Sequence, residues 1–384
     1  MAHHSTVFSQ LLKLFPRHEF RAAAQRHHRG RQLRAISRWD QFLALMLAQL
    51  TGRTSLRDLV ANFNAQAHKL YHLGARTIAR SSLARLNQHQ PAELFELIFR
   101  RLLARTQTIA PGHRFRFKAK LISLDASMVD LAASLFPWAR YQATKGAIKL
   151  HIGLDHDGHL PVFVHLTEGR SHELFWAKTL DLPPGSVVVF DRGFFDFEFF
   201  NQLIQNDIRF VTRMKRDIPY TVVERRQVRA DKGVISDQII RLKGRKARRL
   251  GLQLRHINYR DPETGRHYNF LTSAMDLAAS TVTQVYKDRW QIELFFKWVK
   301  QNLRIKSFLG TSRNAVLSQL WVALTAYLLL AYLKFLGRTG WSMSELLRLL
   351  QLNLFERRSL GTLLRPPDRT IDPDFAQLAL GIGP

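Results

Sequence analysis

The 384-residue sequence contains no cysteine, which excludes disulfide bonds and thiolate metal sites. A reducing compartment is compatible with this absence. The N-terminal stretch lacks the uninterrupted apolar core and small-residue cleavage site of a secretory signal. The longest apolar run, Leu320 to Leu333, is about 14 residues and therefore short for a membrane span. These absences predict a cytoplasmic protein with no membrane partner, in which this run is a buried core helix.

Acidic residues are scarce relative to basic ones. The 30 Asp and Glu residues face 58 Lys and Arg residues, which gives a net charge of +28 and a pI of about 11.1. Such an excess implies a polyanionic partner, either nucleic acid or an anionic membrane surface, and the lack of a membrane segment favours nucleic acid. The hydrophobic fraction of 46% is ordinary for a folded protein, and the length suits two or three domains.

Residues 1–115 are predicted to be helical, and hydroxyl side chains mark two of the helix starts. Ser37 precedes one apolar-periodic segment, and Ser55 or Thr54 precedes a second. A short basic helix, IARSSLARLNQHQ, follows the turn sequence HLGART. Helix, glycine-containing turn and basic helix form the outline of a helix-turn-helix, although plain helical packing explains the pattern equally well. The interpretation for this part is a helical DNA-binding domain.

Alternating and continuous apolar segments typical of strands begin near residue 116. The order is three strands, a helix, a strand, a helix, a strand, an insertion and a last helix, which is the ribonuclease H-like order. We therefore predict an α/β fold with a ribonuclease H-like core and a β-rich insertion, preceded by the helical domain. The predicted ranges are 1–115 for the helical domain, 116–340 for the catalytic domain, 216–267 for the basic insertion, and 341–384 for a helical segment that packs internally or dimerises the protein.

One helix, predicted from Val285 to Phe308, carries charge in an unusual place. At about 100° per residue, its polar residues fall within one stripe roughly 80° wide, and apolar residues cover most of the remaining circumference. A helix apolar nearly all round is buried. The stripe is either a row of ion pairs on a wet face or the lining of a site that holds an anion. Its members are Tyr286, Arg289, Glu293, Lys297 and Lys300.

Three carboxylates are candidates for a metal site. Asp125 lies in the first predicted strand and Asp191 ends the fourth, and these strands are neighbours in a ribonuclease H-like sheet. With Glu293 from the last helix they form an oxygen-only cluster, which suits two Mg²⁺ ions, or Mn²⁺, for phosphoryl transfer. Alone, Asp125 reads as a turn or cap residue and Asp191 as a helix cap. Weaker rivals are Asp130, Glu168, His151 and His172, together with Asp155 and Asp157 in a turn expected to be solvated.

The helix also contains a defined signature, Tyr, two residues, Arg, three residues, Glu, six residues, Lys, which Tyr286, Arg289, Glu293 and Lys300 meet in full. With LDAS and VFDRGF upstream, residues 116–340 resemble a bacterial DDE transposase of the insertion-sequence-four group. The resemblance implies cut-and-paste DNA transposition by a Mg²⁺-dependent enzyme that acts on terminal inverted repeats and target DNA as a homodimer. It also implies that the insertion lies between the second Asp and the Glu.

Further residues are candidates for DNA contacts, and the sequence departs from the family pattern at one of them. The resemblance implies a hairpin step with a flipped base stacked on a Trp, and this Trp corresponds to Tyr268 here, which stacks on a base less extensively. Arg213 and Lys215 on the fifth strand are predicted to reach phosphates, although structural ion pairing explains them nearly as well. Two rival functions remain at this point: a metal-dependent nuclease of the same fold, and a catalytically dead DNA-binding protein derived from a transposase.

Overall fold

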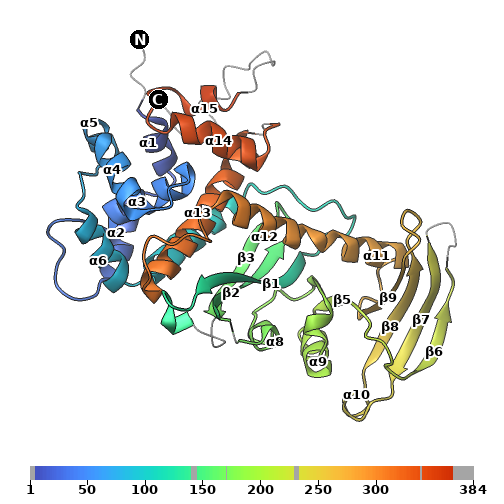
Figure 1. Cartoon of the computed structure of the whole chain (residues 1–384). Helices are drawn as coiled ribbons and strands as arrows, with labels where there is room; N and C mark the ends of the chain where they lie inside the picture. The colour runs from blue at the N-terminus through green and yellow to red at the C-terminus, as the bar shows by residue number, and fades with distance from the viewer. Residues whose placement is uncertain (1–4, 140–144, 170, 229–232, 338–339, 366–384) are drawn as a thin grey trace. The chain divides into compact units, whose positions relative to one another are not determined.

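The computed structural model describes residues 5–139, 145–169, 171–228, 233–337 and 340–365 (Figure 1). The chain divides into two compact units. The helical unit contains Met1–Pro111, Leu131–Trp138 and Lys297–Pro384, and the sheet unit contains Gly112–Asp130 and Ala139–Phe296. The expected boundary at 115 lies near the division at 111. Residues 297–340, which the sequence groups with the catalytic domain, belong to the helical unit.

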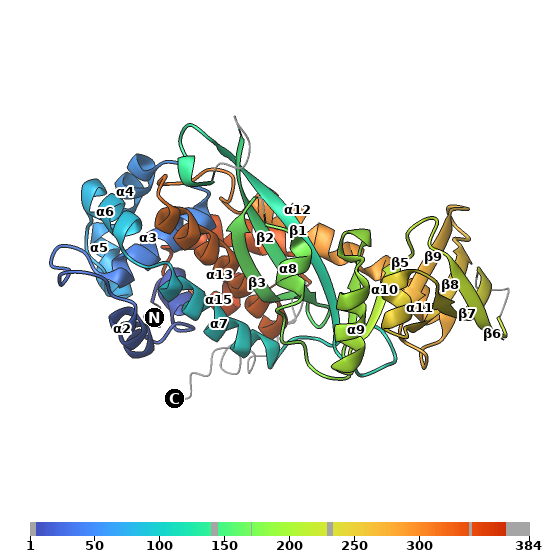
Figure 2. The same cartoon turned by 90° about the horizontal axis from the view of Figure 1, so that it is seen from below.

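The helical unit is built around one long buried helix. α13 (Arg313–Gly337) packs against α3, α6, α7 and α14 (Figure 2). It is long and apolar enough to cross a membrane, but 89% of its most apolar window is buried inside the protein, as the prediction of a core helix requires. The surrounding helices are α1 (Val7–Leu12), α2 (Arg17–Arg26), α3 (Arg38–Thr51), α4 (Leu56–Ala65), α5 (Ala67–Leu70), α6 (Arg80–His89), α7 (Glu93–Gln107), α14 (Met343–Asn353) and α15 (Leu360–Leu363).

Helix starts in this unit follow the predicted caps. The Ser37 side chain accepts from Asp40 N and completes a capping box at α3, and Ser55 accepts from Asp58 N at α4. The helix-turn-helix outline predicted for this part does not match the order of the elements. α5 and a 3-10 helix, η1 (Tyr71–Leu73), lie between α4 and α6, so these two helices are not joined by a short turn.

The C-terminal segment packs onto the start of the chain. Phe8 N donates to Leu354 O (2.8 Å), and the Gln10 side chain donates to Arg358 O (2.7 Å) while accepting from Leu360 N (2.9 Å). Residues 341–365 therefore pack internally within the helical unit. The rest of the predicted dimerisation segment, 366–384, lies outside the described residues, and dimerisation stays a prediction.

The sheet unit contains one nine-stranded sheet in the order β3-β2-β1-β4-β5-β9-β8-β7-β6. β1 pairs in parallel with β4, and β4 with β5, whereas β2 and β3 form the predicted antiparallel hairpin. The core is thus ribonuclease H-like. The strands are β1 (Leu121–Ala132), β2 (Lys145–Asp155), β3 (Leu160–Glu168), β4 (Val187–Phe190), β5 (Arg209–Arg213), β6 (Tyr220–Arg226), β7 (Val234–Leu242), β8 (Gln253–Arg260) and β9 (His267–Thr272).

The predicted insertion continues the sheet. β9 pairs antiparallel with β5, and β8, β7 and β6 follow outward as a meander (Figure 1). A short basic helix, α10 (Arg245–Arg249), connects β7 and β8. The insertion therefore has longer strands than the short strands and turns expected from its weak periodicity.

Side chains alternate between two cores on opposite faces of the sheet. Ile122 and Leu124 of β1 join the core under α8 (Glu173–Ala177) and α9 (Phe197–Gln205). Leu121 joins the core under α11 (Ala279–Asp288). Since successive strand residues point to opposite faces, Ser123 and Asp125 lie on the α11 face.

The predicted single helix from Val285 to Phe308 is wrong in two respects. α11 ends at Asp288 and α12 runs Trp290–Asn302, so Arg289 is a junction between two helices. Arg289 N shares its bond between the carbonyls of residues 285 and 286, which marks a locally tighter turn. After α12 the chain leaves the helix because the Gln49 side chain accepts from Arg304 N (2.8 Å) and Leu303 is buried.

Candidate active site

The structure places Asp125 and Asp191 side by side where the pairing between β1 and β4 ends. Leu124 is in register with Phe190, and each Asp is the next residue. A backbone amide fixes each carboxylate: Asp125 Oδ1 accepts from Ala126 N and Asp191 Oδ1 from Gly193 N, both at 2.8 Å. The two carboxylates were predicted to be neighbours, and the register of β1 with β4 makes them so.

A further carboxylate, which sequence reasoning missed, lies beside this pair. Glu173 is the first residue of α8, and its Oε1 pairs with Lys149 Nζ (2.8 Å). A Cβ built on Gly193 would lie 2.9 Å from Asp191 Oδ1 and 3.3 Å from Glu173 Oε2. The glycine thus leaves room for two acidic side chains to approach. No spacing in the sequence singles out Glu173, because only the fold brings α8 close to Asp125 and Asp191.

Asp125 carries a strongly perturbed pKa. Burial is the largest cause and raises the pKa of its carboxyl to about 7, and the negative charges of Asp191 and Glu173 add to this. The Ala126 amide and the Arg289 charge act in the opposite direction. A buried carboxyl among like charges is an electrostatic arrangement that a divalent cation would stabilise.

Arg289 and Glu293 form an ion pair one helical turn apart, with Arg289 Nη2 2.7 Å from Glu293 Oε1. Burial alone would lower the pKa of Arg289, but Tyr286, Glu293 and Asp125 raise it above its ordinary value. The Tyr286 ring contacts both Phe270 and the Arg289 guanidinium, and burial is the main reason that its own pKa is raised. Within the predicted stripe, Arg289 therefore pairs with Glu293 and contacts the Tyr286 ring.

Several guanidinium groups around these carboxylates keep unused donors. Among the described residues, Arg192, Arg213 and Arg289 each have a buried Nε without a hydrogen-bond partner. The pKa of Arg192 is lowered by burial and then by the nearby charge of Arg213. Cations that repel one another and hold unsatisfied donors suit an anionic ligand such as a phosphate. Arg192 was not predicted, although the sequence DRGF contained it.

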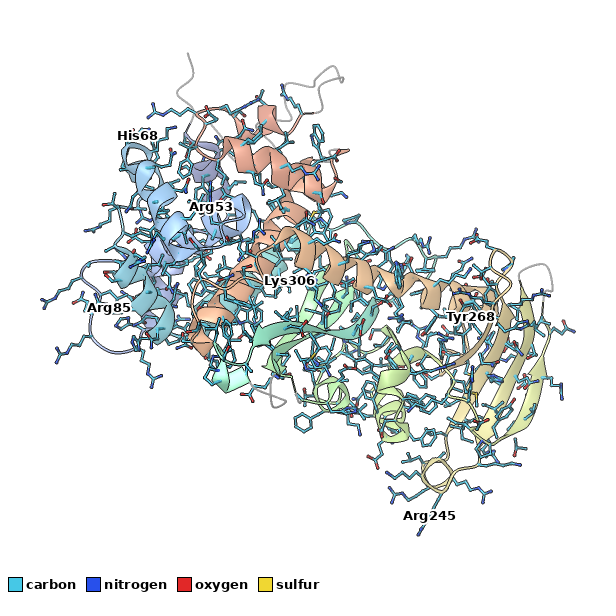
Figure 3. The ribbon with its side chains drawn as sticks, in the orientation of Figure 1. Arg53, His68, Arg85, Arg245, Tyr268 and Lys306 are labelled. Atoms are coloured by element: carbon cyan, nitrogen blue, oxygen red, sulfur yellow. The ribbon has the colours of Figure 1, made fainter. Side chains whose placement is uncertain are left out.

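Tyr268 has close neighbours on its ring. It stands on β9 (Figure 3), parallel to Phe270 with ring centroids 5.9 Å apart, and the Arg213 guanidinium lies 5.0 Å from its centroid. Lys215 similarly lies over Phe195, at 5.2 Å. Base stacking on Tyr268 remains a prediction, and a base that takes the face contacted by Arg213 has to displace that side chain.

Glu293 is not preassembled with the two aspartates into a metal cage. In the part of the chain that the structure describes, no three His, Asp or Glu side chains converge closely enough to hold a metal ion. Glu293 is engaged by Arg289 instead. Lys297 and Lys300 follow Glu293 at i+4 and i+7 on α12, where Lys297 is exposed and Lys300 is half-buried.

Four of the rival candidates have structural roles or surroundings. Lys120 pairs with both Asp155 and Asp157, and Asp155 is buried, so the expectation that both were solvated is wrong. His172 is the N-cap of α8, where its side chain accepts from Leu174 N. A further rival, His151, is buried beside Trp176, and burial lowers its pKa to about 3.

The comparisons with known proteins agree with this architecture. Residues 116–329 match the family described as transposase DDE domain, and the chain belongs to that family. Residues 3–76 match a domain of unknown function, DUF4372. The resemblance to the insertion-sequence-four group is confirmed, and the chain is a transposase of an insertion sequence.

Particular relatives are transposases from diverse bacteria. The putative transposase y4zB of Sinorhizobium fredii is 30% identical over 74% of this chain and 80% of that protein. The probable transposase for insertion sequence element IS5377 of Geobacillus stearothermophilus is 32% identical over 57% of this chain and 58% of its own length. Among solved structures, the piggyBac transposase synaptic complex with hairpin DNA gives a TM-score of 0.48 at 12% identity, covering 98% of this chain and 84% of that one.

Proposed function

We propose that the protein catalyses cut-and-paste transposition by Mg²⁺-dependent cleavage at the terminal inverted repeats of its element, followed by joining to target DNA. One observation carries this proposal. Asp125, within β1, and Asp191, directly after β4, lie side by side where the pairing of these strands ends, and Arg289 and Glu293 follow directly from α11. We also propose that the reaction takes place in the bacterial cytoplasm, with two copies pairing the two ends.

The donor set fits a hard divalent cation. All candidate ligands are carboxylate oxygens, and the pKa of Asp125 is raised first by burial and then by the negative charges of Asp191 and Glu173. Asp125, Asp191 and Glu293 would hold two Mg²⁺ ions, for which Mn²⁺ can substitute, and the ions supply activation of the attacking oxygen and stabilisation of the leaving oxygen. For Glu293 to take part, its carboxylate has to exchange its pairing with Arg289.

The cationic side chains have a separate task, which is to bind the phosphates beside the cut. Release of Glu293 frees Arg289 Nη2, and Arg192 and Arg213 hold buried donors for phosphate oxygens. Water then attacks the phosphorus at the repeat boundary, which forms one P–O bond and releases a 3′-oxygen. The resulting 3′-hydroxyl attacks a target phosphate in the same manner, so positioning and charge neutralisation dominate the chemistry.

The helical unit supplies a surface for binding DNA. Residues of the α2–α3 connection and of α6 line a groove of about 720 Å³ that carries Arg29, Arg31, Arg34 and Arg85. Arg85 projects from α6 (Figure 3). Within the described residues, none of these four arginines takes part in an ion pair, and Gln90 holds the connection in place by accepting from Arg29 N and donating to Arg29 O. A fixed row of exposed arginines is suited to a phosphate backbone.

The proposal is tested by cleavage of linear DNA that carries the gene's own flanking ends. Wild type and Glu293→Gln are compared in Mg²⁺ and in Ca²⁺, with a gel shift as the binding control. We expect Mg²⁺-dependent cuts at the repeat boundary, which the variant loses while it keeps its binding. Binding without any cut by the wild-type protein would instead identify a catalytically dead DNA-binding protein.

A second arm separates a transposase from a nuclease. Pre-cut ends with free 3′-hydroxyl groups are incubated with a supercoiled plasmid and Mg²⁺. A transposase joins the ends to the plasmid and linearises or nicks it, whereas a nuclease of the same fold leaves the ends unjoined.

A further inference from the structure

A buried chain of polar side chains in the sheet unit has no part in the chemistry proposed above. Ser123 Oγ lies 2.7 Å from His156 Nε2, and His156 Nδ1 lies 3.0 Å from Asp288 Oδ2. The residue types are those of a hydrolytic triad, but Ser123 is 0% exposed and His156 only 2%. The Ser123 hydroxyl cannot reach a substrate, so these three side chains do not form a nucleophilic site.

The charge of Asp288 determines which groups donate and which accept in the Ser123–His156–Asp288 series. Burial acts to raise the pKa of Asp288, but the His156 bond and the Arg114 charge hold it below its ordinary value, so this carboxylate is ionised and can only accept. In the neutral imidazole, Nδ1 therefore donates to Asp288, and Nε2 accepts the Ser123 hydroxyl proton. Arg114 Nη2 occupies the other carboxylate oxygen of Asp288 at 2.8 Å.

Ser123 and Asp288, the two end residues of this hydrogen-bonded series, lie next to residues of the candidate active site. Ser123 precedes Asp125 by two residues on the same face of β1. Asp288 is the last residue of α11 and precedes Arg289, which is the junction with α12 and the partner of Glu293. The backbone of His156 is itself held to β1, because His156 N donates to Leu121 O (2.9 Å). One buried ring thus connects the strand that carries Asp125 to the junction that carries Arg289.

We propose that His156 is a positioning residue that holds the Arg289–Glu293 pair in register with Asp125. This inference rests on the proposed function, since it concerns the geometry of that same site. The α11–α12 junction is where a helix axis can change direction, and Asp288 is its last helical residue before the change. Loss of the imidazole bridge leaves the carboxylates and arginines in the protein but lets the junction shift relative to β1.

The test is a double-mutant cycle on single-turnover nicking of end DNA at saturating protein and Mg²⁺. In His156→Gln the side-chain amide takes the place of Nε2 near Ser123, and the bond to Asp288 is lost. Asp288→Asn removes the charge that orients the ring. We expect each variant to nick at least tenfold more slowly, with end-DNA binding within twofold and a melting temperature within a few degrees of wild type.

Coupling between the two sites is the decisive readout. If His156 acts through Asp288, the double variant is no slower than the slower single variant, rather than about a hundredfold slower than wild type. His165→Gln, the same chemical change at an exposed position on β3, is the matched control and should nick at the wild-type rate. Rates that multiply, an unchanged rate in His156→Gln, or a rate that falls only in proportion to the folded fraction would each overturn the positioning role.

Glu293→Gln in the same assay separates this inference from the proposed function. If the wild-type protein nicks and Glu293→Gln does not, the proposed function stands, and a normal His156→Gln then refutes only the positioning role. If the wild-type protein does not nick, or Glu293→Gln nicks normally, the proposed function itself fails.

Discussion

At the scale of single residues, burial of the Asp125 carboxyl costs the protein stability once that carboxyl ionises. Its folded-state pKa of about 7 lies above the ordinary value of 3.8. The folded protein therefore holds a proton that the unfolded chain releases above pH 4. The bound proton's contribution to the free energy of unfolding is fully present below the pKa of the unfolded chain, and it is lost as the pH rises through 7.

We therefore predict that Asp125→Asn stabilises the metal-free protein at alkaline pH, because Asn has no charge to bury. The gain in the free energy of unfolding is at most roughly 4 kcal/mol at pH 8 and shrinks toward zero at pH 4. Urea unfolding in EDTA at several pH values measures it. A variant less stable than wild type at pH 8 would contradict the electrostatic account of this carboxyl.

Gly193 gives a second prediction at this scale. A methyl group there would come 2.9 Å from Asp191 Oδ1, so Gly193→Ala has to displace the carboxylate. We expect Mg²⁺-dependent nicking to fall about tenfold, since small misplacements of reacting groups are costly. Gly244→Ala is the matched control, because a Cβ at Gly244 would meet nothing within 4 Å. Equal rates in the two variants would show that Asp191 tolerates the shift.

Single residues also mark the limit of sequence reasoning. Asp125 and Asp191 were predictable because each follows an apolar strand segment, and the order of strands makes those strands neighbours. Glu173 and Arg192 were not, because their importance depends on where a short helix and a turn lie in space. Likewise, nothing in the spacing of Ser123, His156 and Asp288 reveals that their side chains meet.

At the scale of elements, the predictions that held were those with a strong local signal. The fourth strand, predicted to end at Asp191, is β4 (Val187–Phe190), and the caps of α3 and α4 lie at Ser37 and Ser55. The insertion was harder to predict because β6 is an edge strand with mostly exposed side chains, so its polar and apolar residues follow no burial pattern. The break at Arg289 carried no signal, since neither Gly nor Pro marks it.

The basic connection between α2 and α3 gives an element-scale prediction. Replacement of Arg29, Arg31 and Arg34 by Gln should weaken binding to duplex DNA and lower the slope of log affinity against log salt by up to roughly 3, if each arginine neutralises one phosphate. Fluorescence anisotropy at salt concentrations from roughly 50 to 300 mM gives the slope.

Its control is a second triple variant with the same loss of charge. Arg21, Arg57 and Arg76 are also exposed in the helical unit, but they do not line the groove. Their replacement by Gln should leave most of the salt slope in place. Identical slopes for the two triple variants would mean that net charge, rather than the groove, determines binding.

At the scale of the whole molecule, the ends of the helical unit support one another. Gln10 bonds to both Arg358 and Leu360, and α14 packs on α3. We predict that a chain ending at residue 340 loses the cooperative thermal transition of this unit, whereas a chain ending at residue 365 keeps it. Circular dichroism melting and limited proteolysis compare the two. A sharp transition in the shorter chain would show that α14 and α15 are dispensable.

The division of the chain has a consequence for its synthesis on the ribosome. The helical unit is assembled from Met1–Pro111, Leu131–Trp138 and Lys297–Pro384, and the last stretch supplies α13, around which the N-terminal helices pack. Those helices are translated first but complete their core last. A polypeptide that terminates early within the sheet unit has basic N-terminal helices without their central partner. Premature termination should therefore yield a fragment for degradation rather than a folded competitor for the ends of the element.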